Sequence, residues 1–75
     1  MKEHDLKILP EFFEAHQSGR KTFEVRQDDR GYMVGDTLIL NEWNGLGYTG
    51  RSMAVEVTYI SEYGQYDGWV VMSVR

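Results

Sequence analysis

The spacing of apolar residues changes at Gly19 from a helical repeat to a repeat of two, and the repeat of two recurs in the segments that follow. A repeat of two is typical of a strand with one buried face, because successive side chains of a strand point to opposite sides. Before Gly19, the segment PEFFEAHQSG has Pro10 where its missing N–H is harmless and Gly19 as a terminator, so it predicts one short helix. The chain is therefore expected to be mainly β.

Five short strands are predicted, one before the helix and four after it. Their approximate bounds are His4–Ile8, 22–26, Thr37–Trp43, 52–60 and 67–75. In the second strand, Phe23 and Val25 share one face, and Thr22, Glu24 and Arg26 share the other. In the fourth strand, the alternation predicts a buried face made of Met53, Val55, Val57 and Tyr59.

The number of strands limits the architecture. Five strands and one helix are too few for a sandwich of two covered sheets, whereas closing one sheet on itself removes its exposed edges. We expect an α+β, mainly β fold: a small five-stranded, mostly antiparallel β-barrel with one short helix after the first strand. Residues 1–75 are expected to form a single domain. The alternative is a flat sheet with the helix across one face.

Composition excludes several classes of protein. There are no cysteines, so disulfides and thiolate metal sites are excluded, and His4 and His16 lack a third ligand at a suitable spacing. We therefore expect no metal and no cofactor. The N-terminal segment is broken by Lys7 and Pro10 and predicts neither a signal peptide nor a membrane span, so we expect a cytoplasmic protein. The net charge of -4 restricts any nucleic-acid contact to a short, local one.

The segment around the second strand, residues 20–30, has a slight excess of basic residues although the chain as a whole is acidic. Glu24 and Arg26 point the same way, and the long stem of Lys21 reaches the same edge. One interpretation is that these charges pair with neighbouring strands and are otherwise solvated. The other is that Lys21 and Arg26 hold an anionic or carbonyl group while Glu24 accepts from an amine or ring N–H. That mixture of donors and acceptors suits a nucleobase or nucleotide better than a bare phosphate.

The motifs of the chain resemble those of the ASCH-type branch of the PUA-like superfamily. The matching residues are His4-x-Leu6-Lys7, Gly19-x-Lys21-Thr22-x-Glu24-x-Arg26, Asp29-Arg30, Val34-Gly35-Asp36, YTGR at 48–51 and VEVTYI at 55–60. The resemblance covers nearly the whole chain and is greatest to a compact bacterial and phage subgroup. It implies a small β-barrel associated with RNA or modified nucleosides. It further implies that Lys21, Glu24 and Arg26 line a cleft, with His4, Lys7 and Arg30 near its rim.

Some members of that superfamily are similar to small amidohydrolases of acylated cytidine, with a Lys, a Thr three residues later and a Glu in the last strand. This chain has Lys21 but carries Glu24 in place of the Thr and Ser73 near the place of the Glu, which weighs against that reaction. Ribonuclease activity remains an alternative, because phosphodiester cleavage needs mainly cations and one acid or base. If the protein is an enzyme, Lys21 and Glu24 are its candidate catalytic residues.

Other polar and aromatic residues have structural interpretations. His4 is expected to bond a neighbouring loop, His16 to lie at or near the surface of the helix, and Asp28 to cap a turn. Arg30 is close enough in sequence to reach the Glu24 carboxylate. Among the aromatics, Trp43 is expected to pack in the core, Tyr63 and Tyr66 to be exposed on a loop, and an aromatic beside Arg51 to be a second place for base stacking.

The first hypothesis from the sequence is an RNA- or nucleotide-binding PUA-like module that recognises a short single-stranded RNA or a nucleoside, modified or unmodified. Its predicted binding residues are Lys21, Glu24 and Arg26, supported by Lys7 and Arg30. The second is a small hydrolase that uses the same cleft. The third is a phage or host interaction module whose partner is a protein.

Overall fold

The computed structural model describes residues 1–75 and has six regular elements. They are β1 (Glu3–Ile8), α1 (Pro10–Gln17), β2 (Phe23–Gln27), β3 (Thr37–Trp43), β4 (Tyr48–Ser61) and β5 (Trp69–Val74). The expected α+β, mainly β class and the single helix after the first strand are confirmed. Pro10 is the first residue of the helix, and Gly19 follows its end with a φ of 80°, as the punctuation of the sequence predicts.

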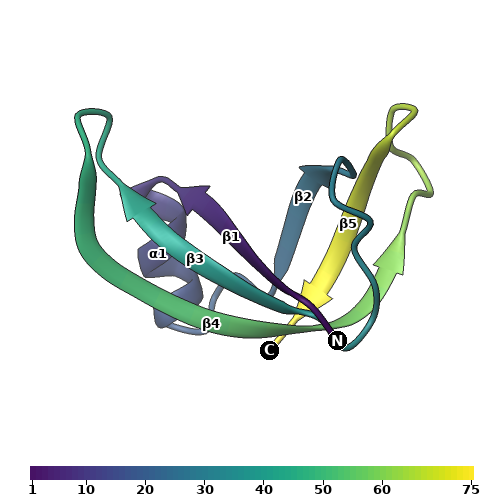
Figure 1. The fold of residues 1–75 in the computed structure, drawn as a ribbon, viewed down its shortest axis with the longest axis horizontal. Helices are drawn as coiled ribbons and strands as arrows, with labels where there is room; N and C mark the ends of the chain where they lie inside the picture. Colours follow the sequence, from purple (N-terminus) through teal and green to yellow (C-terminus); the bar gives the residue numbers. More distant parts are fainter.

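The strands form one sheet in the order β1-β3-β4-β5-β2. The pairing of β1 with β3 is parallel, and the other three pairings are antiparallel. The long β4 bends through the molecule, pairing with β3 along its first part and with β5 along its last part (Figure 1). The sheet is consequently folded into two halves that face each other, with β1 at one edge and β2 at the other.

The sheet does not close into the barrel expected from the sequence, because the edge strands β1 and β2 are not paired. Two arginine side chains lie in the seam between β1 and β2: Arg26 of β2 and Arg30 of the turn that follows β2. Arg26 Nη2 donates to the backbone oxygen of Lys7 at 3.0 Å, and Arg30 Nη1 donates to that of Asp5 at 2.9 Å. Guanidinium groups therefore satisfy edge carbonyls that strand N–H groups would satisfy in a closed barrel.

A register shift in β4 changes which of its side chains are buried. Val55 and Val57 are in the core as predicted, but the pairing with β5 shifts between Val57 and Tyr59. One extra residue at a bulge reverses the alternation beyond it. Tyr59 is therefore 66% exposed, contrary to the sequence prediction, and Ile60 packs against the core instead.

The core lies between the two halves of the sheet and against α1. Its buried apolar residues are Leu6, Ile8, Phe13, Tyr32, Leu38, Leu40, Val55, Val57, Val70, Met72 and Val74. Every buried side-chain polar atom has a hydrogen-bond partner. His4 Nε2, for example, lies 2.8 Å from Asp36 Oδ2, which joins β1 to the turn before β3. The structural interpretation of His4 is confirmed by this contact.

Gly35 is expected to be the residue of that turn least tolerant of a side chain. Its φ is 97°, and a Cβ there would come within 2.7 Å of Met1 Sδ. Because L-residues pay about 1–2 kcal/mol in the left-handed region, Gly35→Ala should lower the free energy of unfolding by about that amount. Gly47→Ala is the control, since Gly47 does not have a positive φ and its Cβ would meet open space. Equal loss in both variants, measured by urea denaturation, would contradict the prediction.

Candidate functional site

The charged face of β2 is turned inward, not outward. Glu24 is only 3% exposed, whereas Phe23 and Val25 on the opposite face are 45% and 42% exposed. A carboxylate is buried only when charged or polar partners compensate for the loss of water. The burial of Glu24 therefore depends on the groups around it.

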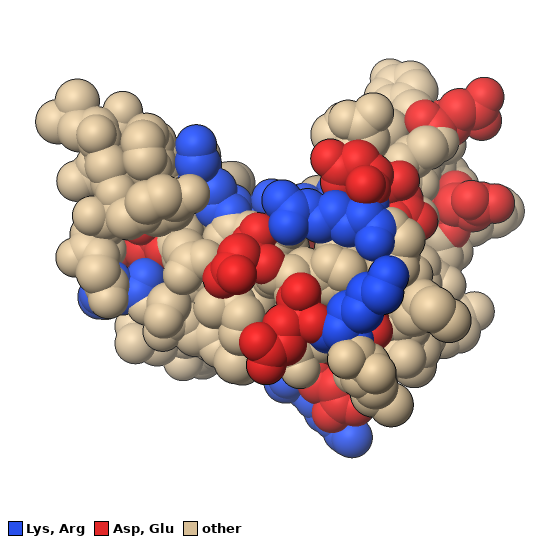
Figure 2. Space-filling view, viewed as in Figure 1, with Lys and Arg blue, Asp and Glu red and all other residues tan.

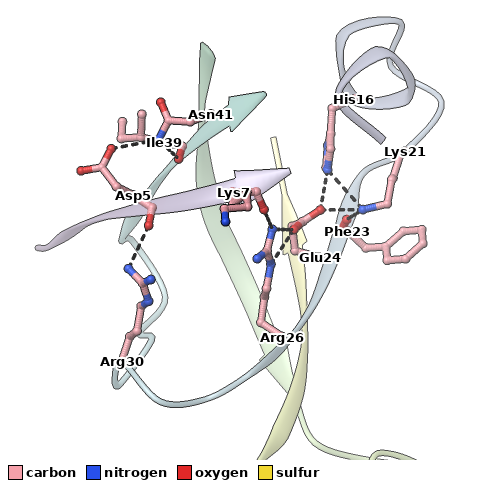
Figure 3. A network of polar contacts seen from close by, with 10 residues as sticks. All are labelled: Asp5, Lys7, His16, Lys21, Phe23, Glu24, Arg26, Arg30, Ile39 and Asn41. Atoms are coloured by element: carbon pink, nitrogen blue, oxygen red, sulfur yellow. Dashed lines mark hydrogen bonds and ion pairs between the residues drawn. The ribbon is translucent and has the colours of Figure 1, made fainter. Parts of the chain in front are cut away.

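Three basic side chains contact the Glu24 carboxylate (Figure 3). Its Oε2 lies 2.5 Å from Lys21 Nζ and 2.7 Å from His16 Nε2, while its Oε1 lies 2.9 Å from both Nε and Nη2 of Arg26. Because an ionised carboxylate can only accept, His16 Nε2 must carry the proton in that contact. We call these four residues, His16, Lys21, Glu24 and Arg26, the Glu24 cluster.

His16 was not among the residues that the sequence marked as functional. It is 7% exposed and faces the sheet from α1, in place of the surface or half-buried position expected for it. Phe13, three residues earlier, is the other buried residue of the helix. Residues three apart lie on the same helical face, so the position of the large apolar Phe13 was the available signal for the burial of His16.

The Glu24 cluster keeps its carboxylate ionised. Burial acts to raise the pKa of Glu24, but the hydrogen bonds from Lys21 and His16 and the charge of Arg26 outweigh burial, so the pKa lies below its usual value of 4.5. Four contacts also occupy the two carboxylate oxygens. The acceptor capacity of Glu24 is thus used within the protein, and what Glu24 does is hold the cations in place.

A hollow of about 410 Å³ opens beside the Glu24 cluster, between β1, the start of α1 and β2. We call it the lysine pocket; it is lined by Lys7, Ile8, Leu9, Phe12, Lys21, Phe23, Glu24, Val25 and Arg26. Three of these residues are cationic and one is acidic, although the chain as a whole carries a net charge of -4. Figure 2 shows basic and acidic side chains interleaved across the hollowed face between the two halves of the sheet.

Aromatic rings flank the cations of the lysine pocket. Phe12 and Phe23 are 40% and 45% exposed. Lys21 Nζ lies 4.7 Å from the centre of the Phe23 ring and 5.4 Å from that of Phe12. Lys7 lies at the mouth of the pocket, with its Nζ 4.1 Å from the Trp43 ring. The pocket therefore presents cationic donors next to accessible π faces.

Arg30, by contrast, does not reach Glu24. Its guanidinium donates to the Asp5 carbonyl and lies 3.7 Å from Asp29. The turn that precedes it is capped as expected, because Asp28 Oδ1 accepts from the backbone N–H groups of Gly31 and Tyr32. That turn directs Arg30 toward β1 along the seam, so of the five predicted binding residues only Arg30 lies outside the lysine pocket.

Arg51, which the sequence indicated as part of a second place for base stacking, pairs with a second buried carboxylate, that of Glu42. Glu42 is 3% exposed and receives Arg51 Nε at 2.9 Å, Arg51 Nη2 at 2.7 Å and Thr49 Oγ1 at 2.6 Å. The bonds from Arg51 and Thr49 lower the pKa of Glu42 to about 2. Arg51 also lies over the Phe13 ring at 4.7 Å, so its guanidinium connects α1 to the sheet.

The remaining aromatic residues divide as follows. Trp43 is half-buried and packs edge-on against Tyr48 at 5.0 Å, at the margin of the core and not within it. Tyr63 and Tyr66 are exposed, as predicted. No group of three or more His, Asp or Glu side chains is arranged to hold a metal ion, and the chain has no helix with the length and apolar character to cross a membrane.

The three buried carboxylates predict loss of stability in acid. The pKa of Asp36 is lowered to about 2, chiefly by His4, that of Glu42 to about 2, and that of Glu24 below its usual value. Because each pKa is lower in the folded chain, the unfolded chain binds more protons as the pH falls. The melting temperature should be constant above about pH 5 and fall from about pH 4.5 to about pH 2. Glu42→Gln should make that fall shallower.

Calorimetry or circular dichroism over this range provides the measurement. A melting temperature that is flat or rises as the pH falls from about 5 to about 2 would contradict the assignment of these pKa shifts.

Comparison with known proteins adds the family. Residues 3–74 match the model of a family described as "Domain of unknown function (DUF3850)". The chain is also similar to a protein of Escherichia phage P2 described as "Uncharacterized 12.9 kDa protein in GpA 3'region", with 35% identity over 65 residues. That alignment covers 87% of this chain and 60% of the phage protein, so the chain spans less than two thirds of that relative. The family match extends over nearly all of the fold described above, and the chain belongs to the DUF3850 family.

Proposed function

We propose that this protein is a binding module for a nucleotide or a short single-stranded RNA, held in the lysine pocket. The observation that carries the proposal is the convergence of Lys7, Lys21 and Arg26 on one hollow that also exposes the rings of Phe12 and Phe23. Cationic donors suit phosphate and carbonyl oxygens, and aromatic faces stack bases of any sequence. A volume of about 410 Å³ lies within the range usual for small-ligand sites.

The donors that remain free in the Glu24 cluster define the ligand contacts. Arg26 uses Nε and Nη2 within the protein, which leaves Nη1 for a ligand oxygen. Lys21 Nζ donates to Glu24 and to the Phe23 carbonyl, and the exposed Lys7 adds a second ammonium at the mouth. Glu24 is a positioning residue in this proposal. This changes the role expected from the sequence, where Glu24 was to accept from the ligand.

The resemblance of the sequence to ASCH-type, PUA-like domains supports the same class of ligand. In that comparison the residues of the G-x-K-x-x-E-x-R pattern line a cleft, and here Lys21, Glu24 and Arg26 line one hollow. The open seam between β1 and β2 departs from the closed barrel that the resemblance implies.

The Glu24 cluster favours binding over hydrolysis. An ammonium that donates to a carboxylate at 2.5 Å and to a carbonyl at 2.9 Å is not free to act as a general base. Thr22 is exposed and does not line the lysine pocket, and Ser73 is exposed on β5. The geometry therefore offers no base and nucleophile pair inside the pocket.

The proposal is tested by titrating the ¹⁵N-labelled protein with ribonucleosides, their monophosphates and short single-stranded oligoribonucleotides at low salt. We expect chemical-shift changes that saturate and that are confined to residues lining the lysine pocket, and the affinity should fall as salt is added. Absence of shifts with every compound, or shifts centred on another surface, would refute the proposal. The same samples reveal hydrolysis, because product signals would accumulate with time.

A further inference from the structure

A second hollow adjoins the lysine pocket along the seam between β1 and β2. It has a volume of about 310 Å³, and we call it the tryptophan pocket. Its lining residues are Leu6, Val25, Arg26, Gln27, Asp29, Arg30, Tyr32 and Trp69. Asp29 and Arg30, from the turn after β2, contribute to its lining.

The two hollows share a wall. Val25 and Arg26 line both of them, so the Arg26 side chain is the ridge between the hollows. The guanidinium of that ridge is held by two partners, the Glu24 carboxylate on β2 and the Lys7 carbonyl on β1. The unpaired Nη1 of Arg26 is thus held at the junction.

Each hollow has the same combination of a cation and an exposed aromatic ring. In the lysine pocket these are Lys21 and Phe23; in the tryptophan pocket they are Arg30 and Trp69, which is 38% exposed. Phe23 and Trp69 are separated along β2, because Trp69 pairs with Gln27, four residues after Phe23. At a rise of about 3.3 Å per residue this separation is roughly 13 Å, which is too far for one base to contact both rings.

We infer that the ligand is an oligonucleotide that occupies both hollows, with one base in each and the linking phosphate at Arg26. This inference rests on the proposed function and narrows it from nucleotides in general to strands of at least two nucleotides. An anionic linker suits the shared position, because Arg26 provides a fixed donor there and the two flanking cations, Lys21 and Arg30, lie on either side of it. Asp29 lines the tryptophan pocket, and its negative charge repels the phosphate of the ligand from that pocket toward Arg26.

The test compares the affinity of the diribonucleotide UpU with that of uridine monophosphate by isothermal titration calorimetry. A second stacked base should make UpU bind at least about tenfold more tightly. In Arg30→Ala and in Trp69→Leu, which keeps an apolar side chain, the ratio of the two affinities should fall toward one. Arg75→Ala is the control; it removes the same charge from a residue that lines neither hollow, and the ratio should stay at the wild-type value.

The outcomes separate the inference from the proposed function. If both compounds bind at the lysine pocket with equal affinity, or if neither variant in the tryptophan pocket changes the ratio, the two-pocket inference is wrong and the proposed function stands. If neither compound binds the wild-type protein, the two-pocket inference is wrong, and the proposed function is decided by the titration with the full set of ribonucleosides, monophosphates and oligoribonucleotides. Far-ultraviolet circular dichroism and melting curves of each variant establish that it is folded before its ratio is interpreted.

Discussion

Glu24→Gln is expected to lower the free energy of unfolding by about 3 kcal/mol at pH 7. The substitution keeps the shape of the side chain but removes the negative charge that compensates the Lys21 and Arg26 cations. Removing one partner of a buried ion pair costs about 3–5 kcal/mol, and the lower end applies because the Lys21 and Arg26 side chains retain 16% and 25% exposure. Domains are stable by only about 5–15 kcal/mol, so this single change removes a large part of the total.

Urea denaturation monitored by circular dichroism gives the measurement, with Glu62→Gln as the control. Glu62 is exposed and forms no ion pair, so the same chemical change there should alter stability by less than about 0.5 kcal/mol. Similar values for the two variants would mean that the contacts of Glu24 contribute no more than those of a surface carboxylate.

Lys21→Ala is expected to weaken ligand binding by at least about tenfold. A hydrogen bond to a charged group contributes about 1.5–3 kcal/mol, and Lys21 also provides charge between the Phe12 and Phe23 rings. The ligand for this test is the compound with the largest saturating shifts in the nucleotide titration. Arg20→Ala is the matched control, because Arg20 is the adjacent cation, is exposed, and has a side chain that bonds only Ser18.

For Lys21→Ala the affinity is measured by fluorescence or calorimetry at fixed salt, after melting curves show that both variants are folded. If Arg20→Ala loses as much affinity as Lys21→Ala, the binding reflects general charge and not the lysine pocket.

Local patterns of the sequence predicted the elements well, because helix and strand ends depend on nearby residues. Pro10 and Gly19 flank the helix as predicted, and β3 has the predicted bounds Thr37–Trp43. Alternation in β2, however, does not specify which of the two faces is buried. The face that carries Glu24 is the buried one, because His16 and Lys21 reach Glu24 from outside the strand and compensate its charge.

Other features could not be predicted because they depend on long-range pairing. The bulge near Tyr59 follows from the pairing of β4 with β5, and no Gly or Pro in VEVTYI indicates it. The open seam depends on Arg26 and Arg30 reaching carbonyls of β1, which are 19 and 25 residues away in the chain. The convergence of Lys21 and Arg26 was predicted only as a hypothesis, and the buried Glu24 between them is its physical cause.

The central claim is that one buried, ionised carboxylate gathers the cations that line the lysine pocket. The most direct test is the pKa of Glu24 itself, measured from the ¹³C shift of its carboxyl carbon during a pH titration. The structure predicts an inflection below the usual 4.5 of a glutamate. An inflection at or above that value would show that burial outweighs Lys21, His16 and Arg26, and would contradict the claim.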